Sequence, residues 1–181
     1  GVPAVSLAGL DGRLLSGRRK STLTIVEGGK KKVLRDDHTG KITSVNTDLI
    51  RVLYEAGYVL VVCPPAISDD HVAVNVDGDR AAARIAEAVT ADDLVILSNV
   101  PGLLRDPDDE ATLIPQIASE ALNEHFGYAK GRMKKKLMAA QEALDGGVGR
   151  VVLGDARIAQ PIRAALGGRG TVIGRPTDHR A

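Results

Sequence analysis

The order of apolar and polar positions predicts short buried strands that alternate with amphipathic helices. Continuous apolar runs predict strands at residues 1–10, 58–63, 94–97 and 151–153, each too short for an ordinary helix. A helical period marks residues 47–56, 81–89, 117–124, 133–144 and 161–166, and a last strand is expected at 170–173. From residue 49 onward this alternation is of the βα type. It predicts an α/β protein with a mostly parallel sheet and helices on both faces.

The first part of the chain has a different pattern, which predicts a β-hairpin flap. Residues 21–26 alternate and are β-branched, a Gly-rich turn follows, and residues 31–34 form the return strand. A second tight turn is expected at Asp11-Gly12. The region is the most basic part of the first half, with Arg13, Arg18, Arg19, Lys20, Lys30, Lys31 and Lys32. These side chains form either a solvated face that blunts edge pairing or a docking surface for an acidic partner.

Composition narrows the class of protein. The 181 residues fit one domain or two small lobes, and only 2% are aromatic, so the core must be aliphatic. A net charge of +1 argues against a general nucleic-acid surface, and no apolar run is long enough to span a membrane. The single cysteine, Cys63, excludes an intrachain disulfide, and its apolar surroundings predict a buried structural thiol.

Polar side chains cluster where two predicted strands end. Asn75, Asp77 and Asp79 surround Gly78 at the start of a helix, and Ser98 and Asn99 follow the strand at 94–97. A carboxylate from Asp77 or Asp79 can cap the helix, and Ser98 can close a strand-exit turn. The alternative is ligand binding, because the carboxyl ends of strands in open α/β sheets are where ligands bind.

The helix that begins near Gly131 has an unusual basic start, Arg132-Met133-Lys134-Lys135-Lys136. Met133 belongs to the apolar stripe, and Lys136 sits at its shoulder, roughly 60° off-centre on a helical wheel. Lys136 is either a snorkelling side chain or a cation that faces an anion, because cations in a first turn oppose the helix dipole.

Taken together, four segments resemble the amino acid kinase family, and more closely its acetylglutamate kinase branch. They are Gly9-Leu10-Asp11-Gly12, Asn75-Val76-Asp77-Gly78-Asp79, Leu97-Ser98-Asn99-Val100-Pro101-Gly102-Leu103 and Gly131-Arg132-Met133-Lys134-Lys135-Lys136. The resemblance implies a three-layer αβα sandwich with a mostly parallel central sheet and the hairpin flap. It also implies that residues 1–76 are the remainder of a substrate-binding lobe and residues 77–181 a nucleotide-binding lobe.

Within that branch the chain is similar to kinases that act on α-aminoadipate or glutamate bound to a small acidic amino-group carrier protein of the LysW type. Asn99 stands where the free-substrate enzymes usually have Asp, and the hairpin is more basic than theirs. The resemblance therefore gives Arg18, Arg19 and Lys20 the role of docking the carrier. The alternatives are an acetylglutamate kinase of arginine biosynthesis and a non-catalytic nucleotide-binding module.

The reaction implied by the resemblance is ATP-dependent phosphorylation of a side-chain carboxylate to an acyl phosphate, with Mg²⁺ held mainly by ATP and no protein metal site. Lys136 would stabilise charge on the transferred phosphoryl group, Asp79 would orient the catalytic lysines, and Asn75 and Asp77 would lie at the substrate. The expected nucleotide contacts are Ser98, Asn99, Val100, Gly102, Leu103, Met133 and Lys136. A cytoplasmic enzyme is expected, homo-oligomeric when complete.

The family's first strand, two Gly-rich loops and substrate arginine have no counterpart in these residues. Because the chain begins on an apolar strand without Met, we expect a preceding segment. Because those parts of the active site are missing, we expect the 181 residues alone to lack appreciable kinase activity.

Overall fold

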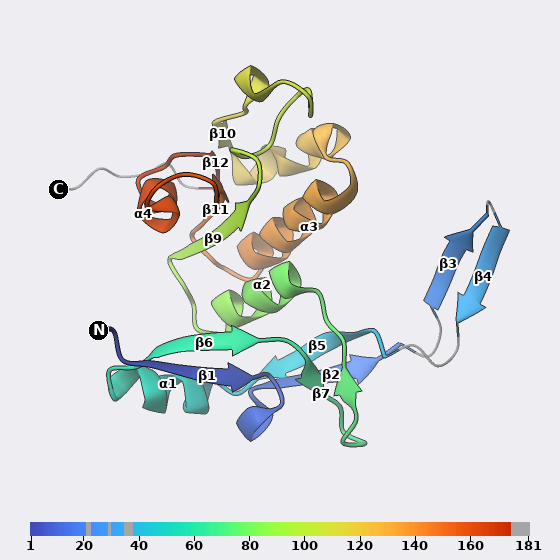
Figure 1. Cartoon of the computed structure of the whole chain (residues 1–181), viewed down its shortest axis with the longest axis vertical. Coiled ribbons are helices and arrows are strands. Elements are labelled where there is room, and N and C mark those ends of the chain that lie inside the picture. The colour runs from blue at the N-terminus through green and yellow to red at the C-terminus, as the bar shows by residue number, and fades with distance from the viewer. Residues whose placement is uncertain (21–22, 29, 35–37, 175–181) are drawn as a thin grey trace. The chain divides into compact units, whose positions relative to one another are not determined.

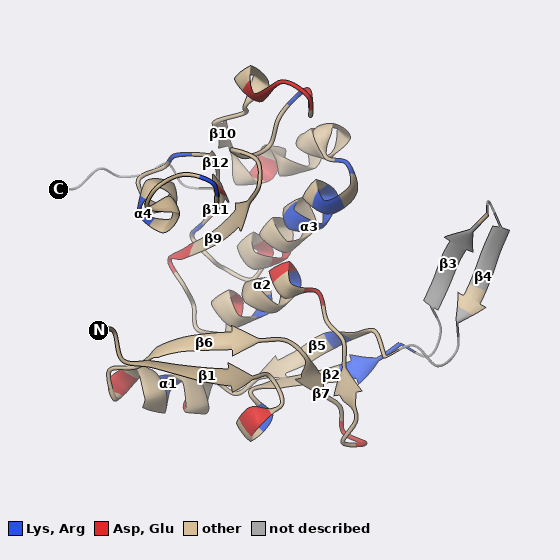
Figure 2. Cartoon of the chain, viewed as in Figure 1, with Lys and Arg blue, Asp and Glu red and all other residues tan. Residues whose placement is uncertain are grey.

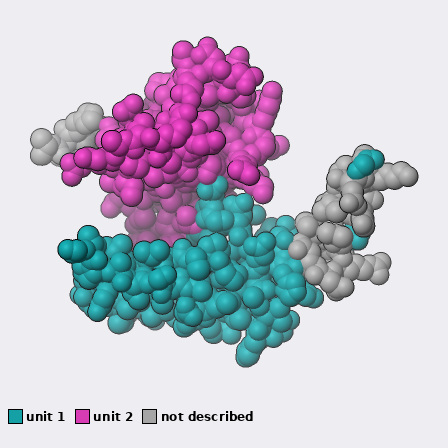
Figure 3. Space-filling view, viewed as in Figure 1, with its two compact units in different colours: residues 1–81 teal, residues 82–181 magenta. Residues whose placement is uncertain are grey.

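The protein is an α/β structure of two compact units. The computed structural model describes residues 1–20, 23–28, 30–34 and 38–174, so the expected tail at 175–181 and the start of the strand predicted at 21–26 lie outside the described residues. Residues 1–81 form unit 1 and residues 82–181 form unit 2 (Figure 3). The predicted α/β class is confirmed.

Unit 1 contains a parallel strand pair covered by a helix. Strand β1 (Ala4–Ala8) pairs with β6 (Val59–Cys63) in the register Ala4 to Val59, and α1 (Thr47–Glu55) packs against β6 (Figure 1). The Asn46 side chain caps α1 by accepting a hydrogen bond from the Leu49 amide at 3.2 Å. The predicted helix and strand are therefore present, and the cap is an Asn, one of the residue types that cap helices best.

Cys63 corrects the sequence prediction, because it is exposed rather than buried. Successive side chains of a strand point to opposite faces. Val59, Val61 and Cys63 consequently share the face of β6 that α1 leaves open, where the two valines are 52% and 53% exposed. An apolar run alone does not reveal whether both faces are covered.

A second, mixed sheet of unit 1 has the strand order β5-β2-β7-β8, with β2 (Leu15–Arg19), β5 (Gly40–Val45), β7 (Ala66–Ile67) and β8 (Ala73–Val74). Its core includes the fully buried Leu14, Leu15 and Val74. The turn expected at Asp11-Gly12 is a 3-10 helix, η1 (Asp11–Arg13), with Gly12 at φ 54°.

The predicted hairpin is confirmed as the antiparallel pair β3 (Leu23–Glu27) and β4 (Lys30–Leu34), which joins Leu23 to Leu34 in register. Gly28, the described glycine of the predicted Gly-rich turn, follows β3 with φ 58°. A positive φ suits glycine there, because it has no Cβ.

Unit 2 is built on a four-stranded sheet with the order β10-β12-β11-β9. Its strands are β9 (Asp93–Ser98), β10 (Gln116–Ile117), β11 (Arg150–Asp155) and β12 (Thr171–Gly174). The pairs β10–β12 and β9–β11 are parallel, but β12 runs antiparallel to β11. The chain between them leaves the end of β11 and enters β12 at the same edge of the sheet. The sheet is thus mixed, which the βα alternation alone did not predict.

Helices cover both faces of this sheet, as predicted. Helix α3 (Gly131–Asp145) packs on one face, where Leu137 and Ala140 join Ile96 and Leu153 in the main core. On the other face Ala165 of α4 (Pro161–Leu166) packs with Val152 and Val172. The remaining helices are α2 (Gly78–Ala88), η2 (Glu110–Thr112) and η3 (Ser119–Tyr128). The helix expected at residues 117–124 is corrected, because Ile117 belongs to β10 and the helix that follows is of the 3-10 type.

Candidate functional site

The carboxyl ends of β9 and β11 lie next to each other in unit 2. Ser98 pairs with Asp155 in the parallel register, and the Ala156 amide donates to the Ser98 carbonyl at 2.7 Å. The Ser98 hydroxyl donates to the Val100 carbonyl at 3.2 Å and accepts from the Val100 amide at 3.4 Å. The predicted strand-exit turn is therefore present, and it holds the exposed Asn99 at its outside. This geometry fits a strand-exit turn, and it also leaves Asn99 available for ligand binding, so it agrees with both interpretations of the Ser98-Asn99 pair.

Gly102 and Leu103, two of the predicted nucleotide contacts, are both buried. Leu103 is 1% exposed within the main core, and its amide donates to the buried Thr171 hydroxyl at 2.8 Å. A Cβ at Gly102 would lie 2.5 Å from the same Thr171 oxygen, so only glycine fits there. These two residues fix the path of the loop, and the Leu103 side chain packs in the core rather than toward solvent.

The first turn of α3 is basic and contains no acidic residue of its own. Its N-cap, Lys130, makes no side-chain capping bond, and Gly131 has a φ of 52°. Figure 2 shows the blue of the basic residues at this end of α3. Arg132 and Lys134 are exposed, while Lys136 is half-buried at the edge of the apolar stripe, as predicted. Met133 is half-buried and packs against the core, which accounts for its place on that stripe. The uncapped amides and the cations form an electropositive helix end.

Sequence reasoning missed an ion-pair cluster beside the Ser98 turn. Arg157 lies 2.7 Å from Asp155 and 2.8 Å from Glu110. Hydrogen bonding to Arg157 lowers the pKa of Asp155 to about 2, and the same bonds, to Asp155 first and then Glu110, raise the pKa of Arg157. Asp155 and Arg157 flank a strand exit in the sequence, which is the signal that could have found them. Glu110 lies 47 positions from Arg157 and does not follow a predicted strand, so the sequence gives no reason to place it in this cluster.

The polar motif before α2 is organised as the capping interpretation predicts. The Asp77 carboxylate accepts from the amides of Asp79 and Arg80 at 3.1 and 3.3 Å. Asn75 is held through its backbone, whose amide donates to His38 at 2.7 Å and whose carbonyl accepts from Gly40 at 2.9 Å. The Asn75 side chain is exposed and Asp79 is half-buried. Asp79 also stands in the first turn of α2, where a negative charge is favourable.

The basic triplet ends strand β2. Arg18, Arg19 and Lys20 are all exposed, and Arg18 pairs with Lys41 of β5 across the sheet (Figure 2). Two like charges directly opposite each other are unfavourable. A hydrogen bond from Ser68, with a smaller contribution from Arg19, lowers the pKa of the nearby Asp70. The hairpin's Lys30, Lys31 and Lys32 have no described side chains.

The predicted site residues thus fall in both units. Asn75, Asp77, Asp79 and the basic triplet belong to unit 1. The predicted nucleotide contacts belong to unit 2, and Lys136 is among them. Each unit is described by itself, so the convergence of Lys136 with Asp79 stays a prediction.

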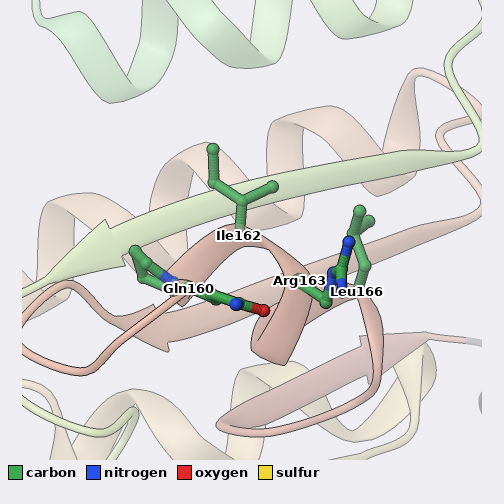
Figure 4. A pocket seen from close by; sticks show the side chains of 5 residues that line it. Gln160, Ile162, Arg163 and Leu166 are labelled. Atoms are coloured by element: carbon green, nitrogen blue, oxygen red, sulfur yellow. The ribbon is translucent and has the colours of Figure 1, made fainter.

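A pocket of about 450 Å³ lies on α4 and is lined by Gln160, Pro161, Ile162, Arg163 and Leu166 (Figure 4). It contains none of the predicted site residues and is largely apolar. Within residues 1–20, 23–28, 30–34 and 38–174, no three His, Cys, Asp or Glu side chains gather so that they could hold a metal ion. In the same ranges, no helix is long and apolar enough to cross a membrane.

Comparison with known proteins places these features in a family. Residues 1–155 match the model described as the amino acid kinase family. A [LysW]-aminoadipate kinase of Deinococcus radiodurans is 57% identical over 173 residues, which are 96% of this chain and 59% of that protein. One of Thermus thermophilus is 51% identical over 96% of this chain and 65% of its own length. The chain therefore spans less than two thirds of these curated relatives.

Solved structures support the same fold. N-acetylglutamate synthase of Neisseria gonorrhoeae, in a complex with coenzyme A and L-arginine, matches with a TM-score of 0.76 and 26% identity over 97% of this chain and 38% of its own. A carbamate kinase of Giardia lamblia matches with a TM-score of 0.66 and 17% identity over 97% of this chain and 66% of its own. At that identity the second likeness concerns the fold alone.

Proposed function

Because this chain belongs to the amino acid kinase family, we propose that it is part of an enzyme that uses ATP to phosphorylate the side-chain carboxylate of carrier-bound α-aminoadipate or glutamate. The product is an acyl phosphate, and the proposed setting is lysine or arginine biosynthesis in the cytoplasm. Two relatives that are more than half identical, both called [LysW]-aminoadipate kinase, support this substrate class. The observation that carries the proposal is the basic, uncapped first turn of α3 with Lys136 half-buried beside it.

That helix end suits a polyphosphate. Backbone amides without a side-chain cap point out of the helix start, and the helix dipole favours an anion there. Cations at the same end oppose the helix dipole, and the phosphates of a bound nucleotide would add a negative charge where both the dipole and the cations favour it. Phosphoryl transfer depends on positioning and charge neutralisation more than on covalent help. Lys136, fixed at the edge of the core, is suited to neutralise charge on the phosphoryl group.

The Ser98 turn is the proposed second contact with the nucleotide. Its exposed Asn99 offers an amide for a ribose hydroxyl or a phosphate, and Val100 is held beside it by the Ser98 hydroxyl. Gly102 and Leu103 would contribute by fixing the loop, as their packing against Thr171 indicates. Mg²⁺ would be bound mainly through ATP phosphates, an arrangement that needs few protein ligands.

The substrate end is assigned to unit 1. Asn75 is anchored by two backbone hydrogen bonds with its side chain exposed, so its amide can hold a carboxylate. Asp79 would orient the lysines around the phosphates, and Asp77 holds the helix start through its cap. Arg18, Arg19 and Lys20 would attract the acidic carrier, because an exposed basic patch steers an oppositely charged partner.

A second candidate is an acetylglutamate kinase, since a protein of that name in Methanopyrus kandleri is 37% identical over 96% of this chain and 67% of its own. A non-catalytic nucleotide-binding module is the alternative from another class. In either kinase, we propose that the 181 residues alone are inactive and that the complete enzyme is a homo-oligomer.

The test compares substrates in a chain of the relatives' full length that contains these residues. Carrier-bound aminoadipate should be phosphorylated far faster than free acetylglutamate, and the opposite preference would favour the second candidate. Lys136→Ala should lower kcat by a factor of about 100, since loss of one charge-stabilising donor costs about 3 kcal/mol. Lys134→Ala is the matched control, because Lys134 is exposed in the same turn. Equal kcat values for the two variants would remove Lys136 from the mechanism, and no turnover with nucleotide binding retained would favour the module.

A further inference from the structure

Three charged side chains, Asp155, Arg157 and Glu110, form one cluster at the carboxyl edge of the unit 2 sheet, here called the Arg157 cluster. The Arg157 guanidinium donates from Nε and Nη2 to the two carboxylate oxygens of Asp155, at 2.8 and 2.7 Å. Its remaining nitrogen, Nη1, donates to the Glu110 carboxylate at 2.8 Å. The Arg157 amide also donates to Asp155, at 2.9 Å. One cation is therefore shared between two carboxylates.

The start of α3 lies at the same edge of the sheet. Only residues 146–149 separate the end of α3 from the start of β11, so the helix runs back along the strand, and Leu137 of α3 packs in one core with Leu153 of β11. The 15 helical residues span about 22 Å and the 6 strand residues about 20 Å, so the two elements match in length. The basic first turn of α3 and Asp155 therefore lie at one edge, together with Ser98, which pairs with Asp155.

The Asp155 carboxylate disfavours an anion at this edge unless its charge is compensated. Its side chain is 11% exposed, so solvent screens its charge poorly, whereas Arg157 and Glu110 are about half exposed. Hydrogen bonding to Arg157 keeps the pKa of Asp155 low, so the carboxylate is ionised at neutral pH. Glu110 adds a second negative charge from the acidic loop at residues 106–110. Loss of Arg157 would leave both carboxylates without the cation that they share.

We propose that Arg157 is a positioning residue that raises the affinity of unit 2 for an anionic nucleotide, because it neutralises Asp155 at the edge where the phosphates bind. The inference rests on the proposed nucleotide site at the Ser98 turn and the start of α3. In this role Arg157 acts through Asp155 and needs no contact with the nucleotide. The charge of Arg157 matters more than its link to the loop that carries Glu110, and this difference makes the role testable.

The test measures binding of ATP with Mg²⁺ by calorimetry, in a chain of the relatives' full length that contains these residues. Arg157→Gln should weaken binding about fivefold, because it removes one positive charge from a partly screened edge. When Asp155→Asn is added to Arg157→Gln, one negative charge is removed as well, so the double variant should bind within about twofold of the wild type. Glu110→Gln should bind ATP at least as tightly as the wild type. A purely structural link predicts the opposite for the last two variants, since each loses a further ion-pairing group.

Arg51→Gln is the matched control. It removes the same charge and the same kind of ion pair, with Asp48 at 2.8 Å, from a helix that contains no predicted site residue. Arg157→Lys keeps the charge and should bind ATP within about twofold of the wild type. The loss in Arg157→Gln should shrink at about 1 M salt, where the Debye length is about 3 Å. Circular dichroism verifies that each variant is folded, and if Arg157→Gln is not, the affinity of Glu110→Gln decides.

Three results would overturn the proposal. These are wild-type affinity in Arg157→Gln, a double variant that binds no better than Arg157→Gln, and weaker binding by Glu110→Gln than by the wild type. If the wild-type chain phosphorylates its substrate and any of the three is found, this inference fails alone. A wild-type chain that binds no ATP would overturn the proposed function together with it.

Discussion

Thr171 connects the loop after β9 to the core of unit 2, and its hydroxyl is the group to remove. The residue is fully buried, and its Oγ1 accepts from the Leu103 amide at 2.8 Å while it donates to the Ile114 carbonyl at 2.6 Å. Leu103 and Ile114 are themselves 1% and 3% exposed. No water can therefore replace the hydroxyl without repacking.

Thr171→Val keeps the side-chain volume and deletes only the hydrogen-bonding group. Each buried polar group left without a partner costs about 1–3 kcal/mol. The Ile114 carbonyl and the Leu103 amide both lose a bond, so we expect the free energy of unfolding to fall by about 2–6 kcal/mol. For a chain of this size that corresponds to a Tm lower by roughly 4–24 °C.

Urea unfolding followed by circular dichroism measures the stability, and hydrogen exchange at the Leu103 amide measures the local effect. Thr171→Ser retains the hydroxyl and loses one methyl group, so it should cost about 1 kcal/mol and keep the amide protected. Thr43→Val, at an exposed position of β5, is the control for the substitution itself. If Thr171→Val had wild-type stability and wild-type exchange at Leu103, the hydroxyl would not be what holds this loop.

Four further outcomes are expected. Gly102→Ala should lower the stability of unit 2 by more than about 1 kcal/mol, because the added Cβ would lie 2.5 Å from the Thr171 hydroxyl. Thermal unfolding measures this, and an unchanged Tm would refute it. Asp77→Ala should cost about 1 kcal/mol and Asp77→Ser much less, since both Asp and Ser cap helices; equal losses would contradict the capping role. The stability that the Asp155 carboxylate contributes should be complete above pH 3.8 and lost as the pH falls toward 2, because the pKa of Asp155 is lowered in the folded state. Asp155→Asn should remove this part of the pH dependence of unfolding. Identical acid unfolding of the variant and the wild type would disprove it. Arg150→Lys should lower the free energy of unfolding measurably, because the Arg150 guanidinium donates to both carboxylate oxygens of Asp93 at 2.6 and 2.8 Å, which a lysine cannot do. Unchanged stability of the variant would show that this two-bond contact is not needed.

The elements that the sequence predicts well are those specified by neighbours along the chain. Helix α4 has the expected bounds, and α1 is within one residue of them, because the helical period on which both predictions rest is a local property of the chain. The shoulder position of Lys136 also follows from helical geometry, and the structure finds it half-buried. Capping by Asp77 belongs to the same class of prediction.

The features that sequence reasoning missed depend on residues far apart along the chain. The hydrogen bond between Leu103 and Thr171 joins residues 68 positions apart, so the sequence around Leu103 contains no signal that this residue belongs to the core. Arg157 joins Glu110 across 47 positions, and that pairing exists only in the fold. Cys63 fails for a related reason, because exposure of one face depends on what covers the sheet and not on the strand's own composition.

A comparison of the helix starts separates structural from functional polar residues. Helix α1 begins with the Asn46 cap and an acid in its first turn, and α2 begins with the Asp77 carboxylate and Asp79. Both follow the rule that negative groups stabilise a helix start. Helix α3 breaks it, with no side-chain cap, no acid in the first turn and a run of cations. A break of such a local rule in the composition of a helix start is expected where function outweighs stability. The long helix of unit 2 therefore begins in a way that an anion would complete, and this is the physical reason to seek the phosphates of ATP at α3 rather than at α1 or α2.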